Sequence, residues 1–490
     1  MTLFTLSIYI GILAILATLA TYFYHKTRNI LVSLLQYFCG FWFIVSGFVK
    51  AVDPLGTAFK MQDYFSQFQF SFKGSFLEFL SPLWPFFSEH AIWVSLFMIL
   101  LEVMLGIMLV IGSNTKFTAW AFLLIMIFFT ILTGFTYLTG YVPDGVNFFD
   151  FSHWGVYTAS NMKVTDCGCF GDFIKLEPKV SFTKDLFLMI PAIIFLFTTR
   201  QFHRLFNPLI NKTINSFSLI GLIIFCLYNT FWAEPIFDFR PFKNKTHVRE
   251  LRAAEMESAA NVPVTMLIKS KTDGKIIKLS QDEYMKRYKE FPKADFDITQ
   301  EAGEPSIPKT KLSDFTLLSL NNEDVTDAFL DNPNYSLMII NYKVPYTTGT
   351  QSVEYKDTTY ANSDSLIDRS NDISARKIVK ITTRTENEIV KVWDTKWIAE
   401  YKEKIMPLIQ SAEKEGIQTI TVFAGMSSDE IQSVMKLTGL SSPVAEADDK
   451  LLKTIIRSNP GIILWKDGSI VKKWHIATDP TWKKIKKKMK

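Results

Sequence analysis

The sequence predicts an α-helical bundle of six membrane spans joined to a soluble α/β domain. Residues 1 to about 235 are dominated by Leu, Ile and Phe and contain six apolar segments of the kind that cross a bilayer. Nearly all of the dense charge of the chain lies after that point. In this second half, segments with the periodicity of strands alternate with segments with the periodicity of helices, which is typical of a sheet covered by helices.

The polar connections between the predicted spans indicate their orientation. Basic residues gather in the first, third and fifth connections, which the positive-inside rule assigns to the cytoplasm. No basic residue precedes the first apolar segment, so we expect an uncleaved span and not a signal peptide. The sequence therefore predicts a protein of the bacterial inner membrane whose soluble half lies in the periplasm. The expected spans are residues 3–23, 30–49, 91–112, 117–138, 186–199 and 214–232.

The second connection, residues 51–90, is rich in Phe and Trp between Pro and Gly residues. Aromatic residues gather at membrane interfaces, so we expect one or two short helices lying on or partly in the outer leaflet. The alternative is a hydrophobic entry for a quinone or a lipid. We expect that the protein requires no cofactor, and that a quinone is the cofactor to consider if the second connection is such an entry.

The fourth connection contains the run D-C-G-C-F-G-D, from Asp166 to Asp172. The pair Cys167 and Cys169 can close into a strained disulfide, or hold two thiols of which one resolves the oxidation of the other. Its predicted position outside the cytoplasm allows a disulfide to persist. The alternatives are a tight glycine turn with two small apolar residues and a metal site. Tetrahedral zinc needs four ligands, however, and only His153 lies close by in sequence, so we expect no metal.

Two ionisable residues belong to the predicted spans. Glu102 falls in the middle of the third span, where a carboxylate should be protonated, paired or directed to a wet cavity. Lys50 closes the second span at its outer end, whereas Glu102 lies roughly 16 Å from the outer end of its own span, at 1.5 Å per helical residue. The partner of Glu102 is therefore left open between Lys50 and four residues with polar side chains, which are Gln36, Thr130, Thr133 and Tyr137. Cys39 and Cys226 lie in apolar spans, and we expect both to be inert core residues.

Three motifs resemble the DoxX and MauE group of small redox-associated membrane proteins. They are the run from Ser46 to Lys50 followed by Asp53-Pro54, the run from Leu101-Glu102 through Gly106 and Gly112, and the D-C-G-C-F-G-D loop. The resemblance covers about residues 30–199 and implies a four-helix membrane unit. MauE members are associated with a thioredoxin-like partner in maturing a disulfide-rich enzyme. The expected site consists of Cys167 and Cys169, supported by Lys50, Asp53, Glu102, His153, Asp166 and Asp172.

The soluble half begins with a predicted β-hairpin. Residues 264–278 alternate around the turn Thr272-Asp273-Gly274. A polar, Pro-containing stretch at about 291–308 is expected to separate this hairpin from the last domain. Within that domain we expect strands at 337–342 and 419–424, helices at 397–415 and 429–437, and a final hairpin at 462–465 and 470–474.

Two features of the last domain resemble thioredoxin-like domains. Pro407 lies inside the first long helix, and Ser458-Asn459-Pro460-Gly461 precedes the final hairpin, where such domains carry a cis-proline. The resemblance covers about residues 311–476. No cysteine follows Cys226, so this domain cannot perform dithiol exchange by itself. It is most simply a binding module. We expect Pro460, Trp397 and Tyr401, or the insertion at about 344–393, to contact a polypeptide.

The sequence leaves two classes of function open. The first is a membrane thiol redox protein in which Cys167 and Cys169 exchange electrons with a client. The second is an envelope scaffold in which the same cysteines form a structural disulfide and the soluble domain binds a protein partner. A transporter is a third alternative. The expected partners are membrane lipid and an extracytoplasmic client or complex subunit, whereas a net charge of +5 on 490 residues gives no indication of nucleic-acid binding.

The expected domains are 1–29 (extra span), 30–199 (DoxX/MauE-like unit), 200–235 (sixth span), 236–308 (linker with hairpin) and 309–490 (thioredoxin-like domain with a basic tail).

Overall fold

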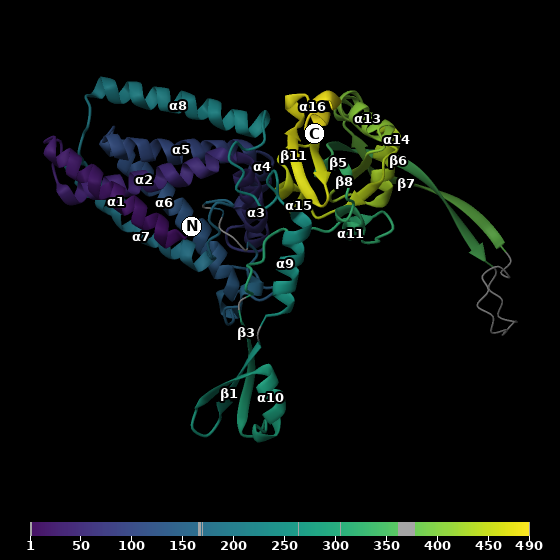
Figure 1. The fold of residues 1–490 in the computed structure, drawn as a ribbon, viewed down its shortest axis with the longest axis horizontal. Helices are drawn as coiled ribbons and strands as arrows, with labels where there is room; N and C mark the ends of the chain where they lie inside the picture. Colours follow the sequence, from purple (N-terminus) through teal and green to yellow (C-terminus); the bar gives the residue numbers. More distant parts are fainter. Residues whose placement is uncertain are drawn as a thin grey trace.

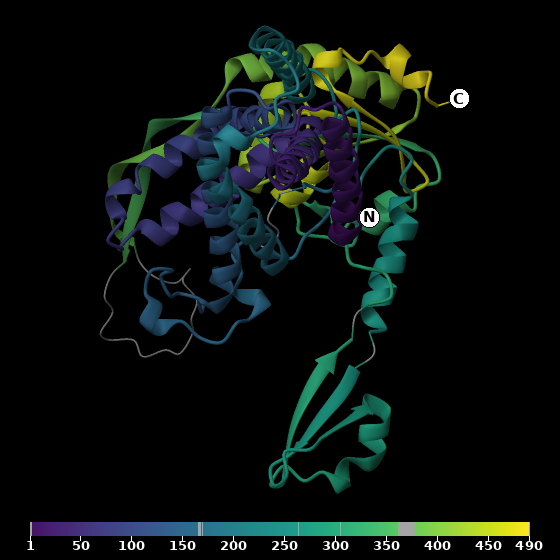
Figure 2. The ribbon, with the colours of Figure 1, turned by 90° about the vertical axis from the view of Figure 1, so that its left-hand side faces the viewer.

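The computed structural model describes residues 2–164, 168, 170–262, 264–303, 305–360 and 378–489. A helical bundle and a mixed α/β domain lie side by side, and two smaller parts project from them (Figure 1). The first is a small β unit that extends away from both bodies, as the turned view also shows (Figure 2). The second is a two-stranded ribbon that extends from the α/β domain (Figure 1).

The described residues form six helices that are long and apolar enough to cross a membrane, as predicted. The last two begin earlier than the sequence predicts, at Pro178 and Pro208. Proline is favoured at the first helical position, where its missing N–H would be unpaired in any case, so these polar first turns still join the helices. The six are α1 (Leu3–Phe23), α2 (Ile30–Val52), α5 (Ala91–Ile111), α6 (Thr115–Leu138), α7 (Pro178–Thr198) and α8 (Pro208–Phe231).

Helix α2 packs closely against α5 along a line of glycines. A Cβ atom placed on Gly47 would lie 2.5 Å from Val103 Cγ2, and one on Gly106 would lie 2.8 Å from the carbonyl oxygen of Gly40. Small residues permit this approach because association inside a membrane depends on van der Waals packing. The predicted core cysteines Cys39 and Cys226 are free thiols and are buried.

The second connection differs from the predicted surface helices. Its main element, α3 (Pro54–Phe72), packs against α5 and places Tyr64, Phe65 and Phe68 in the core of the bundle. The Ser95 hydroxyl of α5 donates to the carbonyl oxygen of Pro54 at 2.9 Å. Helix α5 therefore extends beyond the end of α2, and α3 covers this extension. The connection continues through a 3-10 turn (Glu78–Leu80) and α4 (Leu83–Glu89).

The α/β domain is built on a six-stranded mixed sheet in the order β11-β10-β5-β8-β9-β4. The pairs β5–β8 and β8–β9 are parallel, and the other three pairs are antiparallel. Alternate residues of β5 enter two cores, with Met338 and Ile340 on one face and Leu337 and Ile339 on the other. The strands are β4 (Leu318–Ser319), β5 (Tyr335–Asn341), β8 (Gln418–Phe423), β9 (Val444–Glu446), β10 (Gly461–Lys466) and β11 (Ser469–His475).

Helices cover both faces of this sheet. One core contains side chains of α11 (Thr326–Leu330) and α15 (Asp449–Ile455). The other contains side chains of α12 (Thr395–Glu400), α13 (Met406–Lys414), α14 (Ser428–Thr438) and α16 (Trp482–Lys486). The predicted long helix is thus divided by a π-helical turn, Tyr401–Ile405. Pro407 follows this turn, and because proline has no N–H to donate, the regular hydrogen-bond ladder is interrupted there.

The small β unit is connected by α9 (Val248–Ala260). It contains the predicted hairpin, β1 (Val264–Ser270) with β2 (Ile276–Ser280), together with α10 (Gln281–Arg287). A third strand, β3 (Phe296–Ala302), pairs with β1. The sequence prediction placed β3 in a polar separator, because polar residues interrupt its apolar pattern. The insertion forms the ribbon, in which β6 (Tyr346–Tyr360) pairs with β7 (Ile378–Trp393).

Candidate functional site

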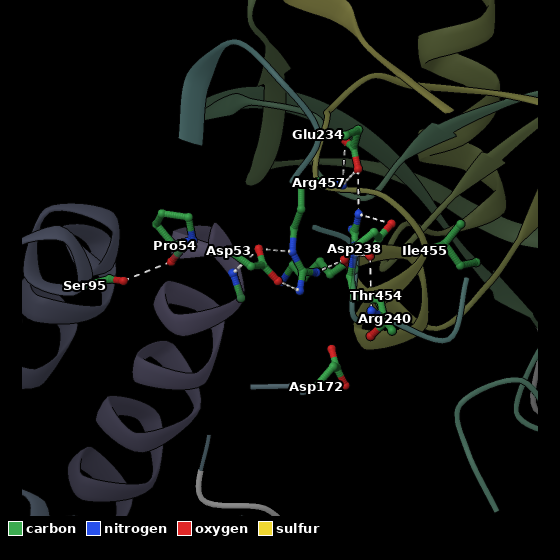
Figure 3. A network of polar contacts seen from close by, with 12 residues as sticks. Asp53, Pro54, Ser95, Asp172, Glu234, Asp238, Arg240, Thr454, Ile455 and Arg457 are labelled. Atoms are coloured by element: carbon green, nitrogen blue, oxygen red, sulfur yellow. Dashed lines mark hydrogen bonds and ion pairs between the residues drawn. The ribbon is translucent and has the colours of Figure 1, made fainter. Parts of the chain in front are cut away.

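The α/β domain contacts the membrane domain through an ion pair between residues 404 positions apart. Arg457 follows α15, and its Nε and Nη2 donate to the two carboxylate oxygens of Asp53 at 2.7 and 2.6 Å (Figure 3). Asp53 lies between α2 and α3 and also accepts the N–H of Gly56 at 3.1 Å, which caps α3. The side chains of Arg457 and Asp53 are 6% and 21% exposed, so this planar two-bond contact is largely removed from water.

The stretch that leaves the membrane extends this contact into a larger network. Glu234 accepts the backbone N–H groups of Arg457 and Ser458, each at 3.0 Å, and an N–H of Arg240 at 2.8 Å. Arg240 also donates to Asp238 at 2.7 Å, and the Lys473 ammonium donates to the same carboxylate at 2.6 Å. Three carboxylates and three cations therefore balance one another where the sixth span, the linker and the α/β domain meet.

The pKa values follow from this balance. Burial raises the pKa of Asp53, but the Arg457 and Arg240 charges outweigh burial, so its pKa lies below its ordinary value. The pKa of Asp238 is lowered to about 2, because Arg240 and Lys473 outweigh the effect of its burial. Burial, followed by the charge of Arg240, lowers the pKa of Lys473 to about 8. The two carboxylates thus remain ionised and paired near neutral pH.

A cavity of about 570 Å³ lies beside this network, between the two domains. Its walls come from α3, the loop before α7, the stretch 235–240 and α15. Gly168 and Asp172 of the D-C-G-C-F-G-D loop line it. Gly168 has a φ of +60°, and a Cβ atom there would lie 2.8 Å from Cγ of Lys60, so the loop approaches α3 as closely as glycine permits. Cys167, Cys169 and Asp166 lie outside the described residues.

Lys50 and Glu102 form a buried ion pair. Lys50 Nζ lies 2.6 Å from Glu102 Oε2, and the side chains are 8% and 3% exposed. The same ammonium contacts the hydroxyl of Ser46 at 3.3 Å and the ring of Phe129 at 4.7 Å from its centre. The rise of roughly 16 Å from Glu102 to the outer end of its own span does not separate it from Lys50, because α5 extends beyond the end of α2. Of the candidate partners for Glu102, the structure therefore selects Lys50.

A second, smaller cavity of about 30 Å³ connects this pair to the loop. Lys50, Glu102 and Gly168 all line it. It shares Lys50, Thr57, Lys60 and Gly168 with the larger cavity. The small cavity therefore adjoins the interdomain cavity, the central glycine of the loop and the ion pair, and most of its remaining lining is apolar.

The two other described residues expected to support the site differ in their placement. The Asp172 side chain lies beside the network (Figure 3) and lines the interdomain cavity. Burial is the main reason that its pKa is raised. His153 is exposed in a 3-10 turn, where its Nδ1 lies 2.7 Å from a carboxylate oxygen of Asp150. It does not line either cavity described above. Among the described residues, no three His, Cys, Asp or Glu side chains are grouped so that they could hold a metal ion.

The expected partner-binding residues are placed differently from the prediction. The Asn459–Pro460 bond is cis, and the loop that contains it contacts this chain's own membrane domain through Arg457. Trp397 and Tyr401 are 8% and 1% exposed in the core of the α/β domain. Their burial leaves almost no side-chain surface for a partner, so the predicted contact role does not fit the structure. Both are aromatic residues on the apolar face of a helix, which is the ordinary pattern of a core.

Sequence reasoning missed Arg457, Glu234, Asp238 and Arg240. Weak signals were present, because Arg457 directly precedes the Ser458-Asn459-Pro460 run and an Asp-Phe-Arg triplet occurs where the chain leaves the last span. A single sequence does not indicate that these two segments meet.

Comparison with known proteins finds a match in the membrane half. Residues 28–144 match the family model described as "Methylamine utilisation protein MauE". The matched region contains Lys50, Asp53 and Glu102 and ends before the cysteine loop. Neither the curated proteins nor the solved structures gave a match. The chain therefore combines a MauE-like membrane domain at residues 28–144, within a set of six candidate spans, with a mixed α/β region that the comparisons leave unidentified.

Proposed function

We propose that this chain is a membrane thiol–disulfide protein of the bacterial inner membrane, in which Cys167 and Cys169 form the redox pair and the periplasmic α/β domain caps their loop. The observation that carries the proposal is the interdomain cavity. It contains Gly168, the residue that links the two cysteines in sequence, and it is bounded by the docked loop of Arg457. A structural disulfide alone would not need such a chamber.

Three features support our proposal that the α/β domain is a thioredoxin-like domain without cysteines. Its central strands β5 and β8 are parallel, a cis-proline precedes the final hairpin, and Pro407 interrupts the helix that follows the ribbon. In this chain the loop beside the cis-proline is directed to Asp53 of the membrane domain. We infer that the domain acts on its own membrane unit as a cap, and presents clients to the cysteine loop from the periplasmic side.

The reaction is a dithiol–disulfide exchange. A client protein with two thiols passes two electrons and two protons to the disulfide of Cys167 and Cys169, so that the client becomes oxidised and both cysteines become thiols. Returning the pair to the disulfide requires a two-electron acceptor, either a quinone, which becomes a quinol, or the disulfide of a second protein, which becomes a dithiol. The matching family is described by methylamine utilisation, and together with the cysteine pair this suggests the maturation of a disulfide-bearing envelope enzyme as the setting.

A redox titration tests the proposal. The intact protein in detergent is equilibrated with a glutathione series, and newly alkylated cysteines are counted by mass. We expect two labels to appear together at a potential above about −250 mV, the range of exchange-active disulfides. The variant Cys167→Ser/Cys169→Ser is the control, because buried Cys39 and Cys226 should not label in it. An initially oxidised pair that remains unlabelled at the most reducing point would exclude the redox function.

The ribbon favours a second candidate, an envelope scaffold. In the described residues, β6 and β7 pair only with each other, and Ile381 and Ile389 are 56% and 78% exposed. An open pair of strands with apolar side chains can accept a further strand from a partner. Co-purification of a fixed partner together with an unreactive disulfide would favour this scaffold over the redox protein.

A further inference from the structure

We propose that a groove beside α7 binds the headgroup of an anionic phospholipid from the leaflet next to the α/β domain. The inference goes beyond the proposed redox function and does not depend on it. The groove has a volume of about 880 Å³, which is within the range of pockets that hold a small organic ligand. Its lining comes from the end of α6, residues 157–162, residues 175–179 at the start of α7, and residues 309–314 before the six-stranded sheet.

The first argument is the charge of the lining. Four lysines line the groove, against two carboxylates. The lysines are Lys175, Lys179, Lys309 and Lys311. Asp314 is shared by the last two, whose Nζ atoms each lie 3.0 Å from one of its carboxylate oxygens. The excess of positive charge remains when Asp172, 3.9 Å from Lys175, is counted. A phosphate group is the anion that such a set of ammonium groups binds at a membrane surface.

The second argument is the rigidity of the wall that carries two of these lysines. The Glu255 carboxylate of α9 is buried and accepts the backbone N–H of Thr310 at 2.9 Å and its hydroxyl at 2.6 Å. It also accepts the backbone N–H of Ser313 at 3.2 Å. Lys309 and Lys311 flank Thr310, so their backbone is already fixed and binding an anion costs less ordering entropy.

The third argument is the opposite wall, which consists of tyrosines where α6 ends at Leu138. The hydroxyl groups of Tyr137 and Tyr141 lie 3.2 Å apart, and the ring of Tyr157 lies 5.5 and 5.3 Å from their rings. A Cβ atom on Gly140 would lie 2.4 Å from the Tyr157 ring, so the absence of a side chain there lets the ring approach. Tyrosine is enriched at the level of lipid headgroups, because its ring is apolar and its hydroxyl is polar.

The fourth argument distinguishes a lipid from a free anion. Lys179 lies in the first turn of α7, where the positive end of the helix dipole adds to its charge, and it forms no ion pair with any described residue. The same helical face continues away from the groove with exposed apolar side chains. They are Leu186, Ile190, Ile193 and Phe197. A free phosphate gains nothing from this face, whereas a lipid headgroup in the groove places its acyl chains along it.

Lipid binding to the intact protein tests this inference. The delipidated protein in detergent is titrated with dioleoylphosphatidylglycerol or dioleoylphosphatidylcholine, and bound lipid is counted by native mass spectrometry. Both lipids have the same chains, but only the first has a net negative charge. We expect the first phosphatidylglycerol molecule to bind at least about tenfold more tightly than the first phosphatidylcholine molecule.

Three variants locate the bound lipid. Lys179→Gln should weaken the binding of phosphatidylglycerol about fivefold, and Lys179→Gln with Lys309→Gln about 25-fold. The matched control is Lys73→Gln, which removes a lysine at the end of α3 that lines none of the three cavities. It should change the affinity by less than about twofold. All three side chains are exposed, so their replacement should leave the fold intact.

Competition separates the lipid from a free anion. Inorganic phosphate at about 10 mM should displace no more phosphatidylglycerol than chloride does at the same ionic strength. Displacement by phosphate alone would identify a free-anion site and overturn the lipid assignment. Equal affinities for the two lipids, or an equal loss of affinity in Lys73→Gln and Lys179→Gln, would overturn the proposed site.

Discussion

The contact between Arg457 and Asp53 is expected to hold the α/β domain over the interdomain cavity, and Arg457→Met tests this. The substitution removes two charged hydrogen bonds, of 2.7 and 2.6 Å, and leaves Asp53 with only the more distant charge of Arg240. Breaking a fully buried pair costs about 3–5 kcal/mol. Asp53 is 21% exposed and keeps the N–H of Gly56, so we expect a smaller loss of docking free energy, about 2–3 kcal/mol.

Hydrogen exchange measured by mass spectrometry gives the readout. The amides of Arg457 and Ser458 donate to Glu234 on the stretch that leaves the membrane, so they should exchange when the domains separate. A loss of 2–3 kcal/mol corresponds to about 30- to 150-fold faster exchange, at about 1.4 kcal/mol per factor of ten. The control is Lys450→Gln, which removes an exposed contact of 3.5 Å to Asp63 and should change exchange by less than about fivefold.

Two further results would decide the interpretation. Adding Asp53→Asn to Arg457→Met should recover part of the protection, because it removes the uncompensated charge. The folded-state pKa of Asp53 is depressed, so its stabilising contribution should be complete at neutral pH and decline as the pH falls below about 4. If Arg457→Met accelerates exchange no more than Lys450→Gln, the domains are held by other contacts and the capping argument fails.

Three other predictions follow from the sequence and the structure. A reporter that is active only in the cytoplasm should be silent when fused after Trp232 or Lys490, and activity at Lys490 would contradict the proposed orientation. Burial raises the pKa of Asp172, so its ionised form opposes folding. Asp172→Asn should therefore raise the melting temperature at about pH 7 and change it little at about pH 4. An equal shift at both pH values would show that the ionised carboxylate is not the cause. Replacing residues 349–390 by a short turn keeps the ion pair of Lys391 with Glu430 and should leave the unfolding of the six-stranded sheet almost unchanged, because in the described structure β6 and β7 pair as strands only with each other. A large loss of stability would show that the ribbon supports the sheet.

The sequence by itself predicted the elements whose cause is local. The six apolar segments, the hairpin at Thr272-Asp273-Gly274 and the strand-helix alternation depend on composition and on periodicities of a few residues, and all of them are present. The motif residues Lys50, Asp53 and Glu102 were also singled out. Their grouping with a cysteine pair came from the resemblance to the DoxX and MauE group, and a MauE match to residues 28–144 supports the membrane part of it.

Tertiary structure decided how these residues meet. Lys50 meets Glu102 because α5 is shifted along its axis relative to α2. The end of α5 that extends beyond α2 is packed against α3. The periodicity of a single helix does not encode such a shift. Trp397 is a core residue and not a contact residue because the face of the helix that carries it packs against the sheet. Asp53 and Arg457 are 404 residues apart, and their pairing follows from the docking of two domains that each bury their own apolar core. Local propensity acts over a few residues, whereas the site lies where distant surfaces of complementary charge come together.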